Sequence, residues 1–233
     1  MGQAVLQAAG EEPAVMVAST HDAGENLAAA IAEANTVIDF TIHKFTGELL
    51  EAALKNGTHL VIGTTGHSDE QRAEIDAAAK QIPIVYAPNF SIGVNTLFWL
   101  TRKAADILTQ DRFDIEVVEM HHRHKIDSPS GTARRLLEIL NEQTGTSYQD
   151  DIAHGRFGNI GPRKSSEIGM HTLRGGDVVG DHTVIFAADG ERVELSHKAS
   201  SRLTFASGAV KAALWLQNQP PGLYDMQDVL GLK

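Results

Sequence analysis

The sequence contains no cysteine, and only 6% of its residues are aromatic. The absence of cysteine excludes disulfides, thiolate metal ligands and a cysteine nucleophile, and it is compatible with a reducing compartment. No apolar run approaches the roughly 18 residues that a membrane-spanning helix needs. The sequence after Met1 also lacks the basic, apolar and small-residue zones of a signal peptide. We therefore expect a cytoplasmic protein that does not bind membranes.

Positive charge is also scarce. Lysine and arginine number 20 against 30 aspartates and glutamates, which gives a formal net charge of -10. Such a chain is not expected to bind nucleic acid or anionic membranes unless its basic residues gather in one place. The content of 42% hydrophobic and 21% charged residues is typical of globular proteins, and 233 residues suit one large domain or two small ones.

The first 90 residues alternate helical patterns with short apolar runs. Helices are predicted over 45–56, closed by Gly57, and over 69–80, opened by Ser68. This βαβ order predicts a doubly wound parallel sheet. The runs typical of strands buried on both faces are residues 15–18, 36–40, 59–63 and 82–86.

Three segments directly follow these predicted strands. The carboxyl ends of parallel strands meet at one edge of the sheet, so we expect the three segments to converge on one ligand crevice. Ordinary turn chemistry at strand ends is the alternative interpretation. The segments are Thr41, Gly63-Thr64-Thr65-Gly66 and Ala87-Pro88-Asn89-Phe90.

After residue 92 the pattern changes to that of an α+β domain. Helices are predicted over 96–108, from about Gly131, and over 205–217. Gly175-Gly176-Asp177 and Asp189-Gly190 are turn signals typical of hairpins, which predicts an open mixed, mostly antiparallel sheet. The predicted strands are residues 113–119, 168–173, 183–188 and 192–195, and residues 145–164 are expected to form a surface loop.

Basic residues gather in one place, since residues 121–125 contain three histidines, one arginine and one lysine. The simplest interpretation is a solvated loop. A metal site formed by His121, His122 and His124 is a second, but neither a helix nor a strand would direct all three rings to one point. The third is a site for an anionic substrate, in which histidine acts as acid or base near neutral pH beside the Lys125 ammonium.

Ser130-Gly131-Thr132 follows this cluster closely. If Ser130 caps a helix that begins near Gly131, the amides of Gly131 and Thr132 at the positive end of the helix dipole would bind a carboxylate. Without the preceding histidines, a simple helix start would be the better interpretation.

The segment Glu119–Ala133 contains the pattern HHRHKxDxPSGTA, and it resembles the signature of the dihydrodipicolinate reductase family, also called 4-hydroxy-tetrahydrodipicolinate reductases. The resemblance extends over nearly the whole chain. Five further segments follow in the family's order, namely residues 37–41, 61–66, 87–95, 174–183 and 196–202.

The resemblance implies a Rossmann-like doubly wound domain formed by residues 1–91 and 202–233, and an α+β domain formed by residues 92–201 that binds substrate and mediates oligomerisation. It implies that NADH or NADPH reduces an unsaturated cyclic dicarboxylate to tetrahydrodipicolinate in lysine and diaminopimelate biosynthesis. It also implies a homotetramer in the cytoplasm.

The resemblance further implies roles for individual residues. His121 would donate or accept a proton, and Lys125 would be a second proton donor. His122 with Ser130, Gly131 and Thr132 would hold the substrate carboxylates, and no metal is implied. The cofactor would contact Met1, Gly63, Thr64, Thr65, Ala87, Pro88, Asn89 and Phe90.

The chain departs from the family pattern in two places. Met1-Gly2 aligns with the last two positions of the family's glycine-rich turn, as if an internal methionine were the start. The first strand and most of the pyrophosphate cradle are then missing, so we expect weakened folding and poor cofactor affinity. His21 and Asp22 stand where the family usually places its ribose-binding residues, so the choice between NADH and NADPH is open.

Two other functions are compatible with the sequence. The chain could be a non-catalytic remnant that binds dicarboxylates or partners but binds cofactor poorly. It could also be a metal-dependent hydrolase that uses the three histidines His121, His122 and His124.

Overall fold

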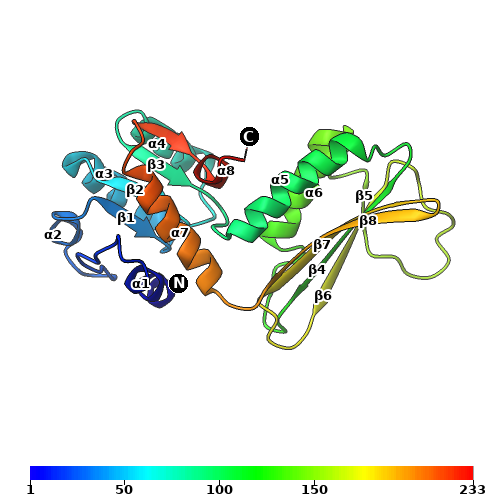
Figure 1. The fold of residues 1–233 in the computed structure, drawn as a ribbon, viewed down its shortest axis with the longest axis horizontal. Coiled ribbons are helices and arrows are strands. Elements are labelled where there is room, and N and C mark those ends of the chain that lie inside the picture. The colour runs from blue at the N-terminus through cyan, green and yellow to red at the C-terminus, as the bar shows by residue number, and fades with distance from the viewer. Residues whose placement is uncertain (233) are drawn as a thin grey trace. The chain divides into compact units, whose positions relative to one another are not determined.

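A computed structural model of the chain describes residues 1–232. The chain forms two compact units (Figure 1). Met1–Ile92 and Arg202–Lys233 make up the first unit, and Gly93–Ser201 make up the second. Within residues 1–232, no helix is long and apolar enough to cross a bilayer.

The first unit is built on a four-stranded parallel sheet. Its order is β1-β2-β3-β9, and the register places Ile38 beside Val61 and Val61 beside Val85. Three of these strands coincide with predicted apolar runs. The strands are β1 Thr36–Asp39, β2 His59–Ile62, β3 Pro83–Tyr86 and β9 Gly222–Tyr224.

Helices cover both faces of this sheet, as the doubly wound prediction requires. Leu60, Ile62 and Ile84 pack on one face against α3 and α4, whereas Val61 and Val85 pack on the other against α7 and α8. The helices of the unit are α1 Gly2–Gly10, α2 Leu27–Ile31, the 3-10 helix η1 His43–Phe45, α3 Thr46–Asn56, α4 Asp69–Ala79, α7 Leu203–Leu216 and α8 Met226–Leu230.

The predicted C-terminal end of α3 and the predicted start of α4 are confirmed. Gly57 closes α3 with a φ of 67°, a left-handed conformation that favours glycine. Ser68 caps α4, and Gln71 returns the hydrogen bond to complete a capping box.

The strand predicted over residues 15–18 is wrong. Met16 is 87% exposed and Val17 is 46% exposed, and the segment pairs with none of the described strands. An apolar run of four residues is too short to hold a strand conformation without a hydrogen-bonded neighbour.

The second unit contains a five-stranded mixed sheet in the order β5-β6-β4-β7-β8. Two of its pairings are parallel and two are antiparallel. The strands are β4 Asp114–His121, β5 Ile152–His154, β6 Ile168–Arg174, β7 Gly180–Ala188 and β8 Glu191–Ala199, and the helices are α5 Ile92–Ile107 and α6 Gly131–Thr144.

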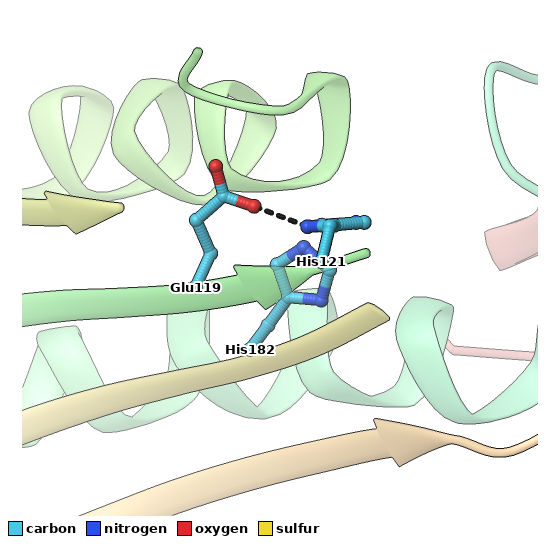
Figure 2. A group of neighbouring side chains, drawn as sticks. All are labelled: Glu119, His121 and His182. Atoms are coloured by element: carbon cyan, nitrogen blue, oxygen red, sulfur yellow. Dashed lines mark ion pairs between the residues drawn. The ribbon is translucent and has the colours of Figure 1, made fainter. Parts of the chain in front are cut away.

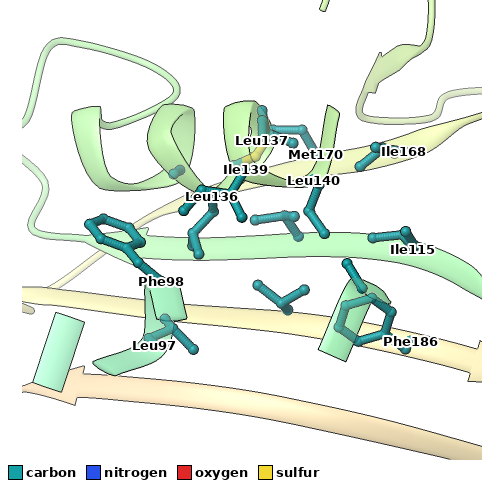
Figure 3. Close-up of a cluster of buried hydrophobic side chains, with 14 of the residues drawn as sticks. Leu97, Phe98, Ile115, Leu136, Leu137, Ile139, Leu140, Ile168, Met170 and Phe186 are labelled. Carbon is teal, nitrogen blue, oxygen red and sulfur yellow. The ribbon is translucent and has the colours of Figure 1, made fainter. Parts of the chain in front are cut away.

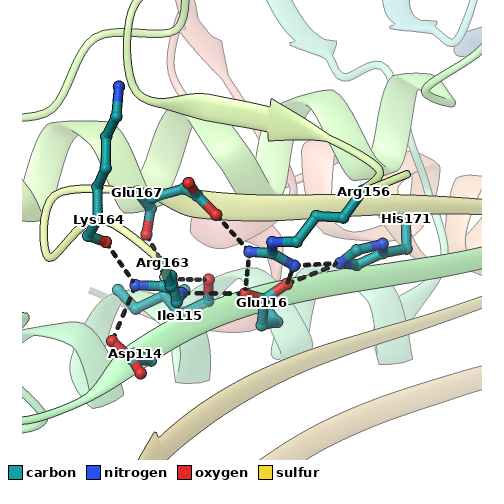
Figure 4. Close-up of polar contacts among 8 residues, drawn as sticks. All are labelled: Asp114, Ile115, Glu116, Arg156, Arg163, Lys164, Glu167 and His171. Carbon is teal, nitrogen blue, oxygen red and sulfur yellow. Dashed lines mark hydrogen bonds and ion pairs between the residues drawn. The ribbon is translucent and has the colours of Figure 1, made fainter. Parts of the chain in front are cut away.

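The turn at Gly175-Gly176-Asp177 does not close a hairpin, which corrects the prediction. Strand β4 lies between β6 and β7 and pairs in parallel with β6. The segment 145–164 is also more ordered than predicted, because it contains β5. Two arginines of this segment, Arg156 and Arg163, form ion pairs with Glu116 (Figure 4).

The core of the second unit lies between one face of the mixed sheet and the helices α5 and α6 (Figure 3). Along β4 the side chains alternate, so Ile115 and Val117 point into this core and contact a cluster that includes Leu136 and Leu140 of α6. The same alternation places Glu119 and His121 on this buried face, at the carboxyl end of β4. The core packing therefore determines the direction of two polar side chains.

Candidate active site

A buried acid–base pair ends strand β4. The Glu119 side chain is 0% exposed and the His121 side chain 10% exposed, and Oε2 of Glu119 lies 2.5 Å from Nδ1 of His121. Figure 2 shows the carboxylate directed toward the imidazole, with His182 of β7 beside them. Residues two apart on a strand share a face, so the spacing of Glu119 and His121 is what brings them together.

The other oxygen of Glu119 is also occupied. Oε1 accepts hydrogen bonds from the Ser130 amide at 3.0 Å and from the Arg174 guanidinium at 3.1 Å. Burial alone would raise the pKa of Glu119, but His121, Arg174 and the Ser130 amide lower it to about 2. Glu119 is therefore a carboxylate at neutral pH, surrounded by donors.

His182 adds a neutral imidazole to this site. It faces Glu119 across the β4–β7 ladder, and its ring meets that of His121 edge-on at 5.1 Å between centroids. Burial, and next the neighbouring His121, lower the pKa of His182 to about 3. The ring is therefore neutral at pH 7, and its Nε2 lies 3.1 Å from the Ser130 hydroxyl.

The N-terminus of α6 opens beside this group. The hydroxyl of Ser130 caps the helix by accepting a hydrogen bond from the Ala133 amide at 3.2 Å. No acidic residue stands in the first turn, and the space around Gly131 is open, because a Cβ there would meet nothing within 4 Å. The positive end of a helix dipole with this much room suits a carboxylate.

The segment between β4 and α6 forms a turn that is fixed at several points. The His122 amide donates to the Val178 carbonyl at 2.7 Å, and the Lys125 amide donates to the His122 carbonyl at 3.1 Å. The Lys125 ammonium pairs with the Asp127 carboxylate at 2.9 Å. The Arg174 guanidinium donates to the Asp127 carbonyl at 2.7 Å, so one arginine connects this turn to Glu119.

The structure therefore brings His121 and Ser130 together through Glu119, and it places Lys125 in the turn that joins them. Three further residues of this group were not predicted to have a role, namely Glu119, Arg174 and His182. A signal for Glu119 was present, because the period of two along β4 places it on the face of His121. His182 and Arg174 come from β7 and β6, and only the tertiary structure shows that they are neighbours of β4.

The three histidines of the metal hypothesis do not converge in this way. The described group with metal-ligand geometry consists of Glu119, His121 and His182 instead. Both oxygens of Glu119 already contact the imidazole, the guanidinium and the amide, and a guanidinium beside the site opposes a cation. The arrangement suits acid–base chemistry better than metal ligation.

In the first unit, polar groups gather where the parallel strands end. Asp39, at the end of β1, is 3% exposed and accepts a hydrogen bond from the Thr64 hydroxyl at 2.7 Å. It also accepts from the Thr41 hydroxyl at 2.6 Å. The segments that follow β1 and β2 are therefore joined to each other by one carboxylate.

The loops at this edge approach closely. A Cβ on Gly63 would lie 2.2 Å from the ring of Phe40, and a Cβ on Gly208 of α7 would lie 1.8 Å from the Phe90 carbonyl oxygen. Ala87 and Phe90 are buried at 2% and 1% exposure. Only glycine at positions 63 and 208 permits this packing.

The residues of the first unit fit a nicotinamide dinucleotide. Helix α1 begins at Gly2 without a side-chain cap and without an acidic residue in its first turn, which suits a pyrophosphate. Met1 is its N-cap residue and is 38% exposed. Together, a doubly wound parallel sheet and a second unit with a buried acid–base pair beside a helix N-terminus define a two-domain α/β oxidoreductase.

Comparisons with known proteins specify the family. The dihydrodipicolinate reductase N-terminal profile matches residues 1–90, and the C-terminal profile of the same family matches residues 93–230. A 4-hydroxy-tetrahydrodipicolinate reductase of Akkermansia muciniphila is 62% identical over 232 residues, which cover 100% of this chain and 94% of that protein. The enzyme of the same name from Thiobacillus denitrificans is 53% identical over 205 residues, covering 88% and 76%.

Among solved structures, the dipicolinate-bound dihydrodipicolinate reductase from Paenisporosarcina sp. TG-14 has the same fold. The TM-score is 0.79 at 23% identity, over 97% of this chain and 94% of that chain. The chain belongs to the dihydrodipicolinate reductase family. It is an oxidoreductase with a nicotinamide cofactor, and it performs the reduction step of this family in lysine and diaminopimelate biosynthesis.

Proposed function

We propose that the second unit binds the dicarboxylate 4-hydroxy-tetrahydrodipicolinate at the start of α6, and that His121 and Lys125 handle the protons of its reduction to tetrahydrodipicolinate. One observation supports this placement above all. A single buried carboxylate, Glu119, contacts His121 through one oxygen and the amide of Ser130 through the other. The acid–base group and the anion-binding helix end are therefore parts of one structure.

The carboxylates of the substrate would be held by positive groups of the 121–132 segment. The amides of Gly131 and Thr132 stand at the positive end of α6. The His122 amide already donates to the Val178 carbonyl, so it is the imidazole of His122 that would add a donor from the adjoining turn. The Ser130 hydroxyl already serves the Ala133 amide and His182, so its contribution is to fix this helix end.

The bound nicotinamide supplies the hydride of the reaction. His121 donates the proton that the ring takes up with the hydride. Lys125, a second proton source in the same turn, protonates the 4-hydroxyl, which leaves as water, and recovers a proton from the neighbouring ring carbon. Fixed cations near the reacting atoms stabilise developing negative charge more in the transition state than in the ground state. In this proposal a carboxylate of the substrate replaces the Asp127 carboxylate as the partner of the Lys125 ammonium.

The first unit is the cofactor domain in this proposal. The α1 N-terminus with Met1 would bind the pyrophosphate, and the strand-end loops would bind the nicotinamide half of NADH or NADPH. His21 stacks on Phe45 at 5.4 Å and lies next to Asp22, in the region that would meet the ribose. The loop residues assigned to the cofactor are Gly63, Thr64, Thr65, Ala87, Pro88, Asn89 and Phe90.

The cofactor assignment is tested by titrating the 233-residue chain with NADH and NADPH and following the fluorescence of the reduced nicotinamide. Saturable binding together with turnover of the dicarboxylate supports the enzyme. A folded chain that binds neither cofactor would instead be a non-catalytic remnant. The ratio of the two dissociation constants decides which cofactor is preferred.

We also propose that the chain is a cytoplasmic homotetramer joined through the mixed sheet. Helices α5 and α6 both pack on one face of that sheet, and no described helix of the second unit covers the other face. Leu173 is a large apolar side chain that is 49% exposed on this other face, since it stands two residues after His171, which contacts Glu116 there. Light scattering during gel filtration measures the subunit number, and a monomeric mass would refute the assembly.

A further inference from the structure

The contact between Glu119 and His121 determines which nitrogen of the imidazole holds a proton. Oε2 and Nδ1 are 2.5 Å apart, and a carboxylate oxygen at that distance repels a lone pair on Nδ1 and attracts a proton there. The pKa of Glu119 is lowered to about 2, so near neutral pH that proton belongs to Nδ1. The remaining nitrogen, Nε2, is then the one that can exchange a proton with another molecule.

The structure keeps space around Nε2. A Cβ built on Gly180, at the start of β7, would lie 2.9 Å from Nε2 of His121. Any larger residue at position 180 would therefore press against this nitrogen. The residue at the start of the neighbouring strand thus leaves Nε2 uncovered, while Glu119 occupies Nδ1.

Glu119 can hold this contact because its own charge and orientation are fixed. Its second oxygen accepts from Arg174 and from the Ser130 amide, at 3.1 and 3.0 Å. Arg174 also donates to the Asp127 carbonyl, in the turn that contains Lys125. Two elements of the unit, β6 through Arg174 and the start of α6 through Ser130, therefore hold one carboxylate in place, so that the imidazole must adapt to it.

We propose that Glu119 is a positioning residue of the reaction: it holds His121 in the form with a proton on Nδ1 and keeps Nε2 for proton exchange with the substrate. This inference rests on the proposed role of His121 as the proton donor. A buried carboxylate that orients a catalytic histidine through Nδ1 is a known device of serine proteases, where the corresponding amide variant favours the wrong tautomer.

The decisive experiment measures the tautomer of His121 directly. In the chain labelled with ¹⁵N histidine, the His121 resonances are assigned with the His121→Gln variant, and their shifts report which nitrogen holds the proton. The expected result near neutral pH is a protonated Nδ1. In Glu119→Gln the amide can donate to Nδ1, so the proton is expected to move to Nε2. A neutral His121 with its proton on Nε2 in the unmodified enzyme would overturn the proposal.

Kinetics provide the second measurement. In Glu119→Gln, kcat is expected to fall at least about tenfold, with a much smaller change in the KM of the dicarboxylate, since the carboxylate-binding groups remain. Glu119→Asp keeps the charge and is expected to recover part of the lost kcat. Wild-type kcat in Glu119→Gln, or equal losses in both variants, would overturn the positioning role.

Glu116→Gln is the matched control for folding. Glu116 lies on the same strand, its pKa is also lowered to about 2, and it is also held by arginines. Its variant is expected to keep the wild-type tautomer and kcat. His121→Gln separates the proposed role of His121 as proton donor from the proposed role of Glu119 as positioning residue. Wild-type turnover in that variant would refute the role of His121 itself, whereas an inactive His121→Gln beside a fully active Glu119→Gln would refute only the inference about Glu119.

Discussion

Strand β4 presents two glutamates to opposite faces of its sheet. Both are carboxylates paired with arginine and histidine, but they have different roles. Glu116 pairs with Arg156, Arg163 and His171 on one face, as Figure 4 shows. Glu119 contacts Arg174, His121 and the Ser130 amide on the other. Burial would raise the pKa of each, yet their partners lower both to about 2.

Glu116 and the histidine paired with Glu119 each require glycine on a neighbouring strand. A Cβ on Gly169 of β6 would overlap the Glu116 carboxylate at 1.8 Å, and a Cβ on Gly180 of β7 would crowd His121 at 2.9 Å. The difference lies in what the partners do. Arg156, Arg163 and their neighbours hold the 145–164 segment on the sheet, whereas the partners of Glu119 lead to a helix N-terminus and a histidine. A perturbed carboxyl pKa therefore does not by itself indicate a catalytic site.

The largest expected difference between the two faces is in turnover. We expect His121→Ala to lower kcat about a hundredfold or more, because a positioned proton donor contributes that much, while the chain remains folded. Steady-state kinetics and thermal denaturation measure the two quantities. Arg156→Gln on the opposite face should lower the thermal midpoint and leave kcat unchanged. Similar kcat values in the two variants would contradict the comparison.

The next effect concerns the turn beside Glu119. Lys125→Met removes an ammonium and leaves Asp127 without its partner. We expect kcat to fall at least about tenfold and the KM of the dicarboxylate to rise, since the variant loses both a proton source and a cation near the substrate. Initial-rate measurements over a range of substrate concentrations separate the two parameters. An unchanged kcat would exclude Lys125 as a proton donor.

A third effect distinguishes the faces by their response to acid. The pKa of His182 is about 3 in the folded chain, against a reference value of 6.5. Between pH 6.5 and pH 3, His182 is therefore protonated in the unfolded chain and neutral in the folded chain. Stability due to a neutral His182 is therefore present above pH 6.5 and is lost as the pH falls from 6.5 toward 3.

We expect the free energy of unfolding of the wild type to drop between pH 7 and pH 5 by about 1–2 kcal/mol more than that of His182→Gln. Urea denaturation at both values measures it. Glu116→Gln should keep the wild-type dependence in this range, because that glutamate titrates below its reference pKa of 4.5. Parallel losses in His182→Gln and the wild type would refute a neutral buried His182.

The last effect concerns the face without catalytic groups. Arg163 contacts Asp114 and Glu116 through its side chain and donates to the Ile115 carbonyl at 2.8 Å. Arg163→Gln should lower the free energy of unfolding by about 1–2 kcal/mol, a modest figure because its partners are partly exposed. Urea denaturation measures this loss, and kcat should remain unchanged.

Much of the fold could be predicted because local signals agreed with tertiary packing. Gly57 and Ser68 marked helix boundaries, and the alternation along β4 marked its buried face. The strand predicted over residues 15–18 was wrong, because a strand needs a hydrogen-bonded neighbouring strand, and the apolar run does not show whether one is present. The turn at Gly175-Gly176-Asp177 misled for a related reason, since a turn signal does not say whether a third strand lies between the two it connects.

The candidate site was predictable only in part. The 121–132 segment is contiguous, so its histidines, lysine and helix start could be found together in the sequence. His182 and Arg174 follow their partners by more than 50 positions along the chain, as the separations of 52 from Ser130 and 55 from Glu119 show. Such neighbours arise from strand order, which pattern and propensity do not determine.

The interleaved path of the chain has a consequence for synthesis on the ribosome. Helix α7 covers Val61 and Val85, yet it is translated only after the whole of Gly93–Ser201. At about 5–20 residues per second, the nascent parallel sheet keeps one apolar face uncovered for on the order of ten seconds. During that interval the N-terminal segment is a natural client for chaperones, and a premature stop after residue 201 would leave that face uncovered for good.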